Sequence, residues 1–173
     1  MKRQVLCRKE YLVLKLISNP NMLLLVFYLG DEKYLIQHDN IREISPMVVL
    51  KKMPLMPDYF AGFFNYRGQV VPVVDLCQFI QGYPCRMQLS TRIMLVDYQK
   101  TNQSSAILGL MAEKLTEAIR KPTVTFISSG PVLPKSRYLK GFVIERDKMI
   151  PCLNLETLLK QLYLDTDYVS ATD

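Results

Sequence analysis

Residues Gly62–Ile80, GFFNYRGQVVPVVDLCQFI, have a related stretch later in the chain at Gly141–Leu159, GFVIERDKMIPCLNLETLL. The two stretches align without a gap, and each reads as a strand, a polar turn, a second strand and a short helix. The identical pairs are Gly62 and Gly141, Phe63 and Phe142, Arg67 and Arg146, Pro72 and Pro151, and Leu76 and Leu155. Because internal repeats reveal how a chain is built, the sequence predicts two small, similar β units joined side by side.

Short β-rich runs separated by turn signals extend outward from this repeat in both directions. Further runs lie at 23–29, 34–37, 92–98, 106–112 and 115–119, besides the strands of the repeat itself. Two sets of about five short strands favour small closed barrels over a helix-covered parallel sheet. The predicted fold class is therefore all-β with a few short helices.

Two helices are expected, one after each copy of the repeat. Asp75 can accept a hydrogen bond at the start of the first, with Gln78 three residues later, and Gly82 can end it in the left-handed conformation. The second helix shows one apolar face, formed by Leu155, Leu158, Leu159 and Leu162.

The predicted domain organisation follows the repeat. Residues 1–21 are expected to be an N-terminal extension and residues 166–173 a frayed tail. The segment 22–165 is expected to be one domain, with a first barrel over 22–90 and a second barrel plus the C-terminal helix over 91–165.

Composition excludes several classes of protein. No apolar stretch of the 173 residues approaches the length of a membrane span. The four cysteines (Cys7, Cys77, Cys85 and Cys152) are scattered, form no Cys-x-x-Cys pair, and cannot complete a zinc site with the lone His38. We interpret them as reduced thiols, which fits a cytoplasmic protein, and expect neither a metal nor a cofactor. With one histidine and no glycine-rich phosphate loop, no catalytic constellation is present, so an enzyme is not expected.

Arg67 is the most conspicuous single residue, because it lies in a turn just before a wholly apolar strand. One interpretation is that its stem covers the barrel while its guanidinium binds backbone carbonyls. The other is an ion pair with a carboxylate, Glu43 being a candidate, that fixes an exposed surface for docking.

Two longer stretches, LLVFYLGDEKYLIQHDNIREI (24–44) and PDYFAGFFNYRGQVVPVVDL (57–76), carry a family resemblance. They resemble the CheW-type coupling proteins of bacterial chemosensory systems. The family's Asn-x-Arg-Gly-x-x-x-Pro-x-x-Asp-Leu pattern is present as Asn65, Arg67, Gly68, Pro72, Asp75 and Leu76. The resemblance runs from about residue 23 to residue 159.

This resemblance implies a fold of two five-stranded SH3-like barrels and a non-enzymatic adaptor. The implied partners are the regulatory domain of a CheA-type histidine kinase and the cytoplasmic tip of a methyl-accepting receptor, with a membrane reached only through the receptor. The receptor's helical hairpin would lie in the groove between the barrels. The family's functional positions fall on Ile41, Glu43, Gly62, Arg67, Ile93 and Gly109, and Glu43 with Arg67 match its acid–Arg pair.

Some features depart from the family pattern, among them Glu113 where Asp is usual and Asn154 where Asp is common. Together with Tyr66 and the Leu89–Arg92 segment, they resemble adaptors of non-flagellar pathways of the WspB type. Two hypotheses of other classes stay open. One is an SH3-like protein that binds nucleic acid through a basic surface, given the net charge of +6; the other is a cysteine-dependent enzyme.

Overall fold

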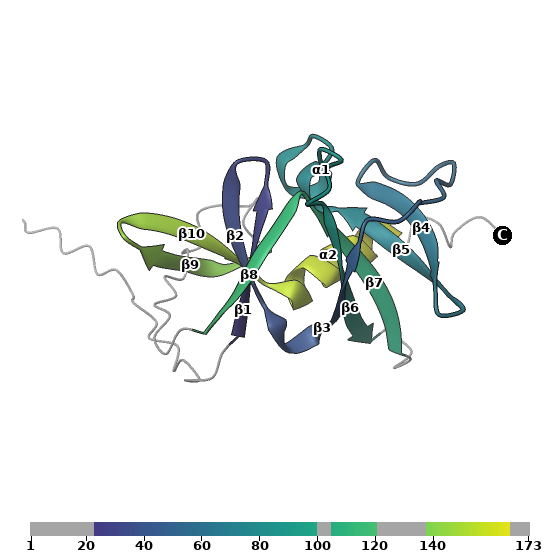
Figure 1. Cartoon of the computed structure of the whole chain (residues 1–173). Helices are drawn as coiled ribbons and strands as arrows, with labels where there is room; N and C mark the ends of the chain where they lie inside the picture. Colours follow the sequence, from purple (N-terminus) through teal and green to yellow (C-terminus); the bar gives the residue numbers. More distant parts are fainter. Residues whose placement is uncertain (1–22, 100–104, 121–137, 167–173) are drawn as a thin grey trace, which may run out of the picture.

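The computed structural model describes residues 23–99, 105–120 and 138–166, which form two five-stranded sheets and two α-helices (Figure 1). The predicted extension at 1–21 and nearly all of the predicted tail lie outside the described residues. The strands are β1 (Leu23–Leu29), β2 (Glu32–Gln37), β3 (Ile41–Pro46), β4 (Phe60–Tyr66), β5 (Gln69–Asp75), β6 (Arg92–Gln99), β7 (Ser105–Ala112), β8 (Lys114–Arg120), β9 (Leu139–Glu145) and β10 (Lys148–Leu153). The helices are α1 (Leu76–Gln81) and α2 (Leu155–Thr166). The predicted fold class, mainly β with few helices, is confirmed.

The two sheets have the same strand pattern but exchange strands between the two repeats. Their orders are β8-β1-β2-β10-β9, here called sheet A, and β3-β6-β7-β5-β4, here called sheet B. If β1–β5 and β6–β10 are the two repeats, each sheet combines the first hairpin of one repeat with the last three strands of the other. The predicted split into barrels at residues 90 and 91 is therefore wrong. The two copies carry equivalent strand edges, so local sequence patterns do not specify which copy a strand joins.

Two pairings in each sheet join strands of different repeats: an antiparallel one, β1 with β8 or β3 with β6, and a parallel one. In sheet A, Cys152 of β10 lies opposite Leu35 of β2. In sheet B, Val73 of β5 lies opposite Gly109 of β7. The remaining neighbours are antiparallel. The chain passes from sheet A to sheet B after β2 and returns after β7, which ties the lobes into one unit.

Sheet B curls until its two edges meet. The segment after β3 reaches β4, where Lys51 and Phe63 exchange backbone hydrogen bonds of 2.8 and 2.9 Å. This contact joins the β3 edge of sheet B to its β4 edge, which are not neighbours in the strand order. The closure agrees with the predicted SH3-like barrel.

Helix α1 begins and ends where the sequence predicts. The Asp75 carboxylate accepts a hydrogen bond of 3.1 Å from the Gln78 backbone N–H, and Gly82 is left-handed with φ of 82°. The second half of the expected capping pair is replaced, because the Asp75 N–H donates to the Tyr59 carbonyl at 2.8 Å. That bond fixes the start of the helix to the segment that leads into β4.

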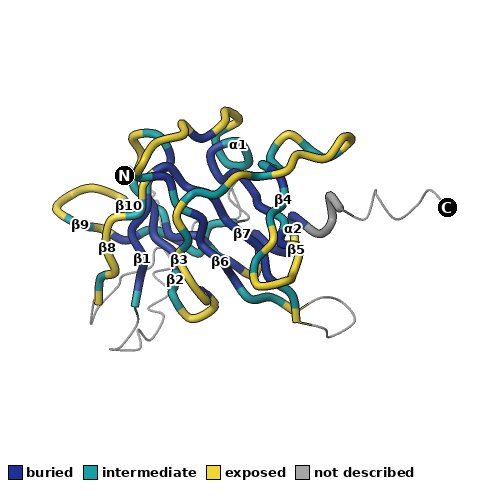
Figure 2. The backbone as a smooth tube through the Cα atoms, turned by 45° about the vertical axis from the view of Figure 1, so that its right-hand side comes forward, coloured by how far each residue is buried: buried dark blue, intermediate teal, exposed yellow. Residues whose placement is uncertain are grey.

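The core is shared between the lobes. A large apolar cluster draws side chains from both sheets, and four leucines of α2 belong to it: Leu155, Leu158, Leu159 and Leu162. Helix α2 lies between the two groups of strands in Figure 1, so its predicted apolar face packs within its own domain. A smaller cluster sits inside sheet A alone. In Figure 2, β1, β6 and β7 are largely buried, whereas the hairpin tips are exposed.

The turns of the two repeated hairpins allow a test of backbone strain. Both turns need two consecutive residues with positive φ: Arg67 and Gly68 have φ of 51° and 85°, and Arg146 and Asp147 have φ of 46° and 63°. Glycine adopts this conformation without steric cost, whereas other residues are strained. We expect Asp147→Gly to raise the free energy of unfolding by a few tenths to about 1 kcal/mol in urea titrations.

The matched control is the reverse change, Gly68→Asp, in the first hairpin. A Cβ atom on Gly68 would have no neighbour within 4 Å, so backbone strain alone is added there. A loss of similar size is expected. Equal stability of both variants and the parent chain would contradict strain at these turns.

Candidate functional site

Glu43 and Arg67 come together at the closing edge of sheet B. Glu43 lies on β3, and Arg67 lies in the turn between β4 and β5. Arg67 Nη2 is 3.3 Å from Glu43 Oε2, and the Tyr66 hydroxyl donates to the same oxygen at 2.5 Å. The Arg67 guanidinium lies 5.1 Å from the centre of the Tyr66 ring. Of the two interpretations of Arg67, the ion pair with Glu43 is the one present.

A second ion pair extends this surface along β3. Arg42 Nη2 lies 2.7 Å from Asp97 Oδ1 on β6. We call the five side chains of Arg42, Glu43, Tyr66, Arg67 and Asp97 the candidate docking surface. Exposed ion pairs of this kind contribute little to stability, and a role of this surface in docking stays a prediction.

Hydrogen bonds within this surface shift the pKa values of Tyr66 and Arg42. The hydrogen bond to the Glu43 carboxylate, followed by burial, raises the pKa of Tyr66. The phenol therefore stays protonated and remains a donor at neutral pH. Hydrogen bonding to Asp97 likewise raises the pKa of Arg42. The Arg67 side chain is 76% exposed and that of Glu43 is 42% exposed, so both can be reached by a partner.

The other four predicted site residues lie inside the protein. Ile93 is fully buried and Ile41 nearly so. A Cβ atom on Gly62 would lie 2.9 Å from the Lys51 carbonyl oxygen, so Gly62 permits the bridge that closes sheet B. A Cβ atom on Gly109 would lie 2.8 Å from Cγ2 of Ile93. In this conformation these residues shape the barrel beneath the docking surface.

Gly109 gives a second stability prediction. Gly109→Ala is expected to lower the free energy of unfolding by about 2 kcal/mol, because the added methyl group overpacks the contact with Ile93. Chemical denaturation measures the loss, and a double-mutant cycle tests its cause. In an Ile93→Ala background the cost of Gly109→Ala should shrink; an unchanged cost would place the conflict elsewhere.

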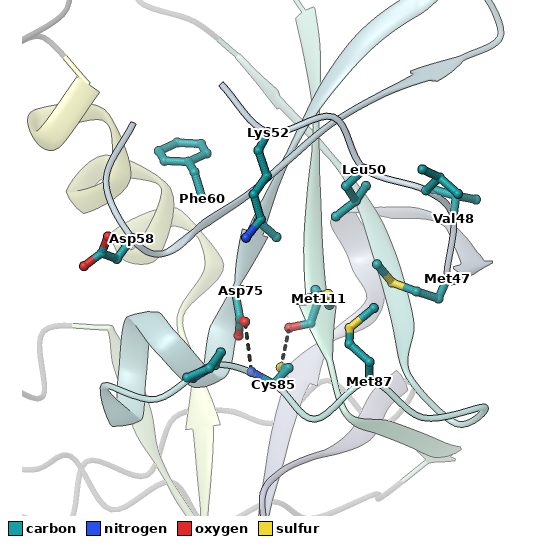
Figure 3. A pocket seen from close by; sticks show the side chains of 13 residues that line it. Met47, Val48, Leu50, Lys52, Asp58, Phe60, Asp75, Cys85, Met87 and Met111 are labelled. Atoms are coloured by element: carbon teal, nitrogen blue, oxygen red, sulfur yellow. Dashed lines mark hydrogen bonds between the residues drawn. The ribbon is translucent and has the colours of Figure 1, made fainter. Parts of the chain in front are cut away.

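An apolar cavity of about 620 Å³ opens at the end of β4 away from Arg67 (Figure 3). Its apolar lining comes from the β3–β4 connection, from the segment after α1 and from Met111 of β7. Lys52 and Asp58 also line it. A second hollow lies where α2 meets sheet B, between Asp97 and Tyr98 on one side and Glu156 and Lys160 on the other. Its lining comes from sheet B, α2 and Asn40, so the predicted groove between the two barrels stays a prediction.

Two groups of interacting side chains were not predicted from the sequence. Arg86 forms an ion pair with the buried Glu113, 2.9 Å from Nη2 to Oε2. Cys77 and Cys85 bring their sulfur atoms within 2.7 Å of each other beside Asp75. Neither spacing matches a motif, and the only hint was that Glu113 stands at a position where the family resemblance expects an acid.

Comparison with known proteins bears directly on this architecture. A family model described as the CheW-like domain matches residues 23–162. The chain belongs to the CheW-like domain family. The family resemblance is thereby confirmed, whereas a place in the WspB-like branch stays a prediction. CheW family proteins are scaffold adaptors and not enzymes.

Individual CheW relatives and a solved structure agree with the family match. The chain is 29% identical over 136 residues to the chemotaxis protein CheW of Helicobacter pylori, covering 78% of this chain and 79% of that protein. It is 27% identical over 108 residues to protein FrzA of Myxococcus xanthus, covering 61% and 68%. The crystal structure of the scaffolding protein TtCheW from Thermoanaerobacter tengcongensis matches with a TM-score of 0.66 and 25% identity, over 78% of this chain and 85% of that one.

Proposed function

We propose that this chain couples methyl-accepting chemoreceptors to a CheA-type histidine kinase, in the cytoplasm and without chemistry of its own. The observation that carries the proposal is the extent of the CheW-like match, which includes every described strand and most of α2. Its relatives include proteins named chemotaxis protein CheW and a scaffolding protein. The docking surface and the hollow beside α2 then offer places for the two partners.

The state of the thiols speaks against the cysteine-dependent enzyme. Burial raises the pKa of the Cys152 thiol to about 11. The hydrogen bond to Cys77, together with burial, also raises the pKa of the Cys85 thiol. A catalytic cysteine needs a thiolate at neutral pH, and these environments oppose one.

Ion pairs reduce part of the positive charge on which the nucleic-acid alternative depends. Lys33, Arg42, Arg67 and Arg86 each form an ion pair with an acidic side chain. These four cations therefore offer less charge to a phosphate backbone, and the alternative is decided by a binding measurement.

Co-purification tests the adaptor function. The full chain should elute together with the regulatory domain of its cognate CheA-type kinase, and with a fragment of the receptor tip. Each single contact of this kind can have a low affinity, because many contacts in a receptor array together give a high avidity. The chain should therefore also be titrated at high concentration with each partner separately. Absence of binding to both partners, with tight salt-sensitive binding to DNA or RNA, would reverse the assignment.

A further inference from the structure

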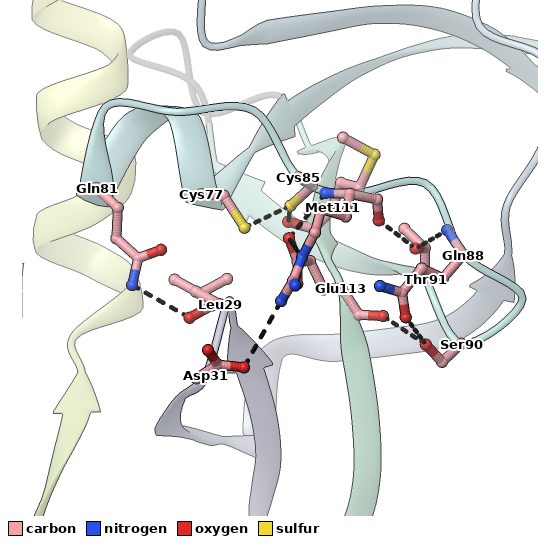
Figure 4. Close-up of polar contacts among 11 residues, drawn as sticks. Leu29, Asp31, Cys77, Gln81, Cys85, Gln88, Ser90, Thr91, Met111 and Glu113 are labelled. Atoms are coloured by element: carbon pink, nitrogen blue, oxygen red, sulfur yellow. Dashed lines mark hydrogen bonds and ion pairs between the residues drawn. The ribbon is translucent and has the colours of Figure 1, made fainter.

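Cys77 and Cys85 form a buried thiol pair at one end of helix α1. Cys77 lies in the first turn of the helix, and Gly82 turns the chain back so that Cys85 returns against it. The Cys85 thiol donates to Cys77 Sγ at 2.7 Å, and both residues are buried (Figure 4). A disulfide bond is about 2.05 Å long, so the sulfur atoms need to approach by only a fraction of an ångström.

The backbone around the pair is held in place by one carboxylate. Asp75 Oδ1 accepts the Gln78 N–H at 3.1 Å, and Asp75 Oδ2 accepts the Cys85 N–H at 2.9 Å. The next residue, Arg86, is anchored to Glu113 through its backbone N–H at 2.7 Å. These hydrogen bonds hold the backbone on both sides of the thiol pair in place.

We propose that Cys77 and Cys85 are a site of oxidative modification, at which a hydroperoxide forms an intramolecular disulfide. The Cys85 thiol first loses its proton, which its raised pKa makes rare at neutral pH, so the reaction is slow there. The resulting thiolate attacks the terminal peroxide oxygen, the O–O bond breaks, and the leaving alkoxide takes up that proton to give the alcohol. Cys77 Sγ then attacks the sulfur of the Cys85 sulfenic acid, its thiol proton departs, and the S–O bond breaks to release water. Two thiols and one hydroperoxide thus give one disulfide, one alcohol and one water.

A disulfide fits this place better than a metal ion, although Asp75, Cys77 and Cys85 offer three ligand atoms within 4.8 Å of one another. Two thiolates on a tetrahedral zinc lie roughly 3.7 Å apart, given Zn–S bonds of about 2.3 Å, so the sulfur atoms would have to separate. Both Asp75 oxygens already accept backbone N–H groups.

The cavity gives the oxidant a route to the pair. Cys85 lines the apolar cavity together with Met87 and Met111, whereas Cys77 is fully buried behind it. Cys85 is therefore the first thiol oxidised, and Cys77 is the one that attacks its sulfenic acid. The new bond would fix the segment 83–87, which forms one wall of the cavity and carries Arg86.

The test uses the full chain carrying Cys7→Ser, treated with hydrogen peroxide and then denatured and alkylated. We expect two fewer alkylated thiols, an intact mass lower by two hydrogens, and a cross-linked peptide joining Cys77 to Cys85. The thermal midpoint should rise by about 5–10 °C and return after dithiothreitol. Oxidation should accelerate with pH, because the thiolate is the reacting species.

Matched variants separate this pair from the other buried thiol. Cys152→Ser should leave the cross-link intact, while Cys85→Ser and Cys77→Ala should each abolish it. Oxidation that adds oxygen without a cross-link, or a cross-link between other cysteines, would overturn the proposal. So would stoichiometric binding of Cd²⁺ by the reduced pair with no disulfide formed by peroxide. The peptide map of the parent chain decides the matter even if a cysteine variant fails to fold.

Discussion

Replacement of Arg86 by Met is expected to lower the free energy of unfolding at neutral pH by more than the loss of an exposed ion pair would. Its partner Glu113 lies where β7 leads into β8, and the Glu113 side chain is only 4% exposed. The Arg86 guanidinium binds both carboxylate oxygens, with Nε at 3.2 and 3.1 Å and Nη2 at 2.9 Å. Met keeps the apolar stem and removes these donors, so a buried carboxylate is left with backbone N–H groups alone.

At acidic pH the difference in free energy of unfolding between Arg86→Met and the parent chain should become smaller. Burial raises the pKa of Glu113, but the hydrogen bonds from Arg86 outweigh it and hold the pKa below its ordinary value of 4.5. In the parent chain the stabilisation is complete above that value and is lost as the pH falls through the lower, folded pKa. In Arg86→Met burial dominates, so the carboxyl takes up its proton at higher pH. Urea titrations between neutral pH and pH 4 measure the change.

Two control variants are needed to interpret the effect of Arg86→Met on stability. Glu113→Gln should cost less, about 1–2 kcal/mol, because its amide oxygen can still accept from Arg86 and no buried charge is stranded. Arg42→Met removes an exposed ion pair, with side chains 45% and 40% exposed, and should cost less than about 1 kcal/mol. Equal losses for Arg86→Met and Arg42→Met would show that burial of Glu113 adds nothing.

The local features of this fold could be predicted because their signals are local. Asp75 and Gly82 bound helix α1 through contacts within a few residues. The hairpins around Gly30 and Arg67 follow from turn chemistry and alternating apolar residues in the same way. The exchange of strands between sheets could not be predicted, since either copy offers an equivalent edge.

The same distinction applies to side chains. The Glu43–Arg67 contact was expected from a family pattern, not from spacing. Arg86 and Glu113 are 27 positions apart, and their carboxylate–guanidinium contact depends on where β7 ends. Cys77 and Cys85 meet only because a left-handed Gly82 reverses the chain and Asp75 holds both ends. Contacts that depend on tertiary closure leave no mark in periodicity or composition.

Charge reversal at the docking surface is the second large effect. Arg67→Glu should weaken binding to the kinase regulatory domain or to the receptor tip at least about tenfold, which corresponds to about 1.4 kcal/mol. The new carboxylate would face Glu43 and repel it, and the cation offered to a partner would be lost. Stability should change by less than about 1 kcal/mol, because the pair is exposed. Titration calorimetry with each partner measures the affinity.

The second repeat supplies the control, because Arg146 occupies the equivalent turn of the other hairpin. Arg146→Glu makes the same change in net charge on sheet A, so it corrects for long-range electrostatics. If Arg67 acts through its ion pair, the double exchange Glu43→Arg with Arg67→Glu should recover part of the affinity. If the partner contacts the guanidinium itself, the exchange should not help. Equal binding by the parent chain, Arg67→Glu and Arg146→Glu would remove Arg67 from the interface, because a cation that contacts a partner cannot be reversed without a loss of affinity.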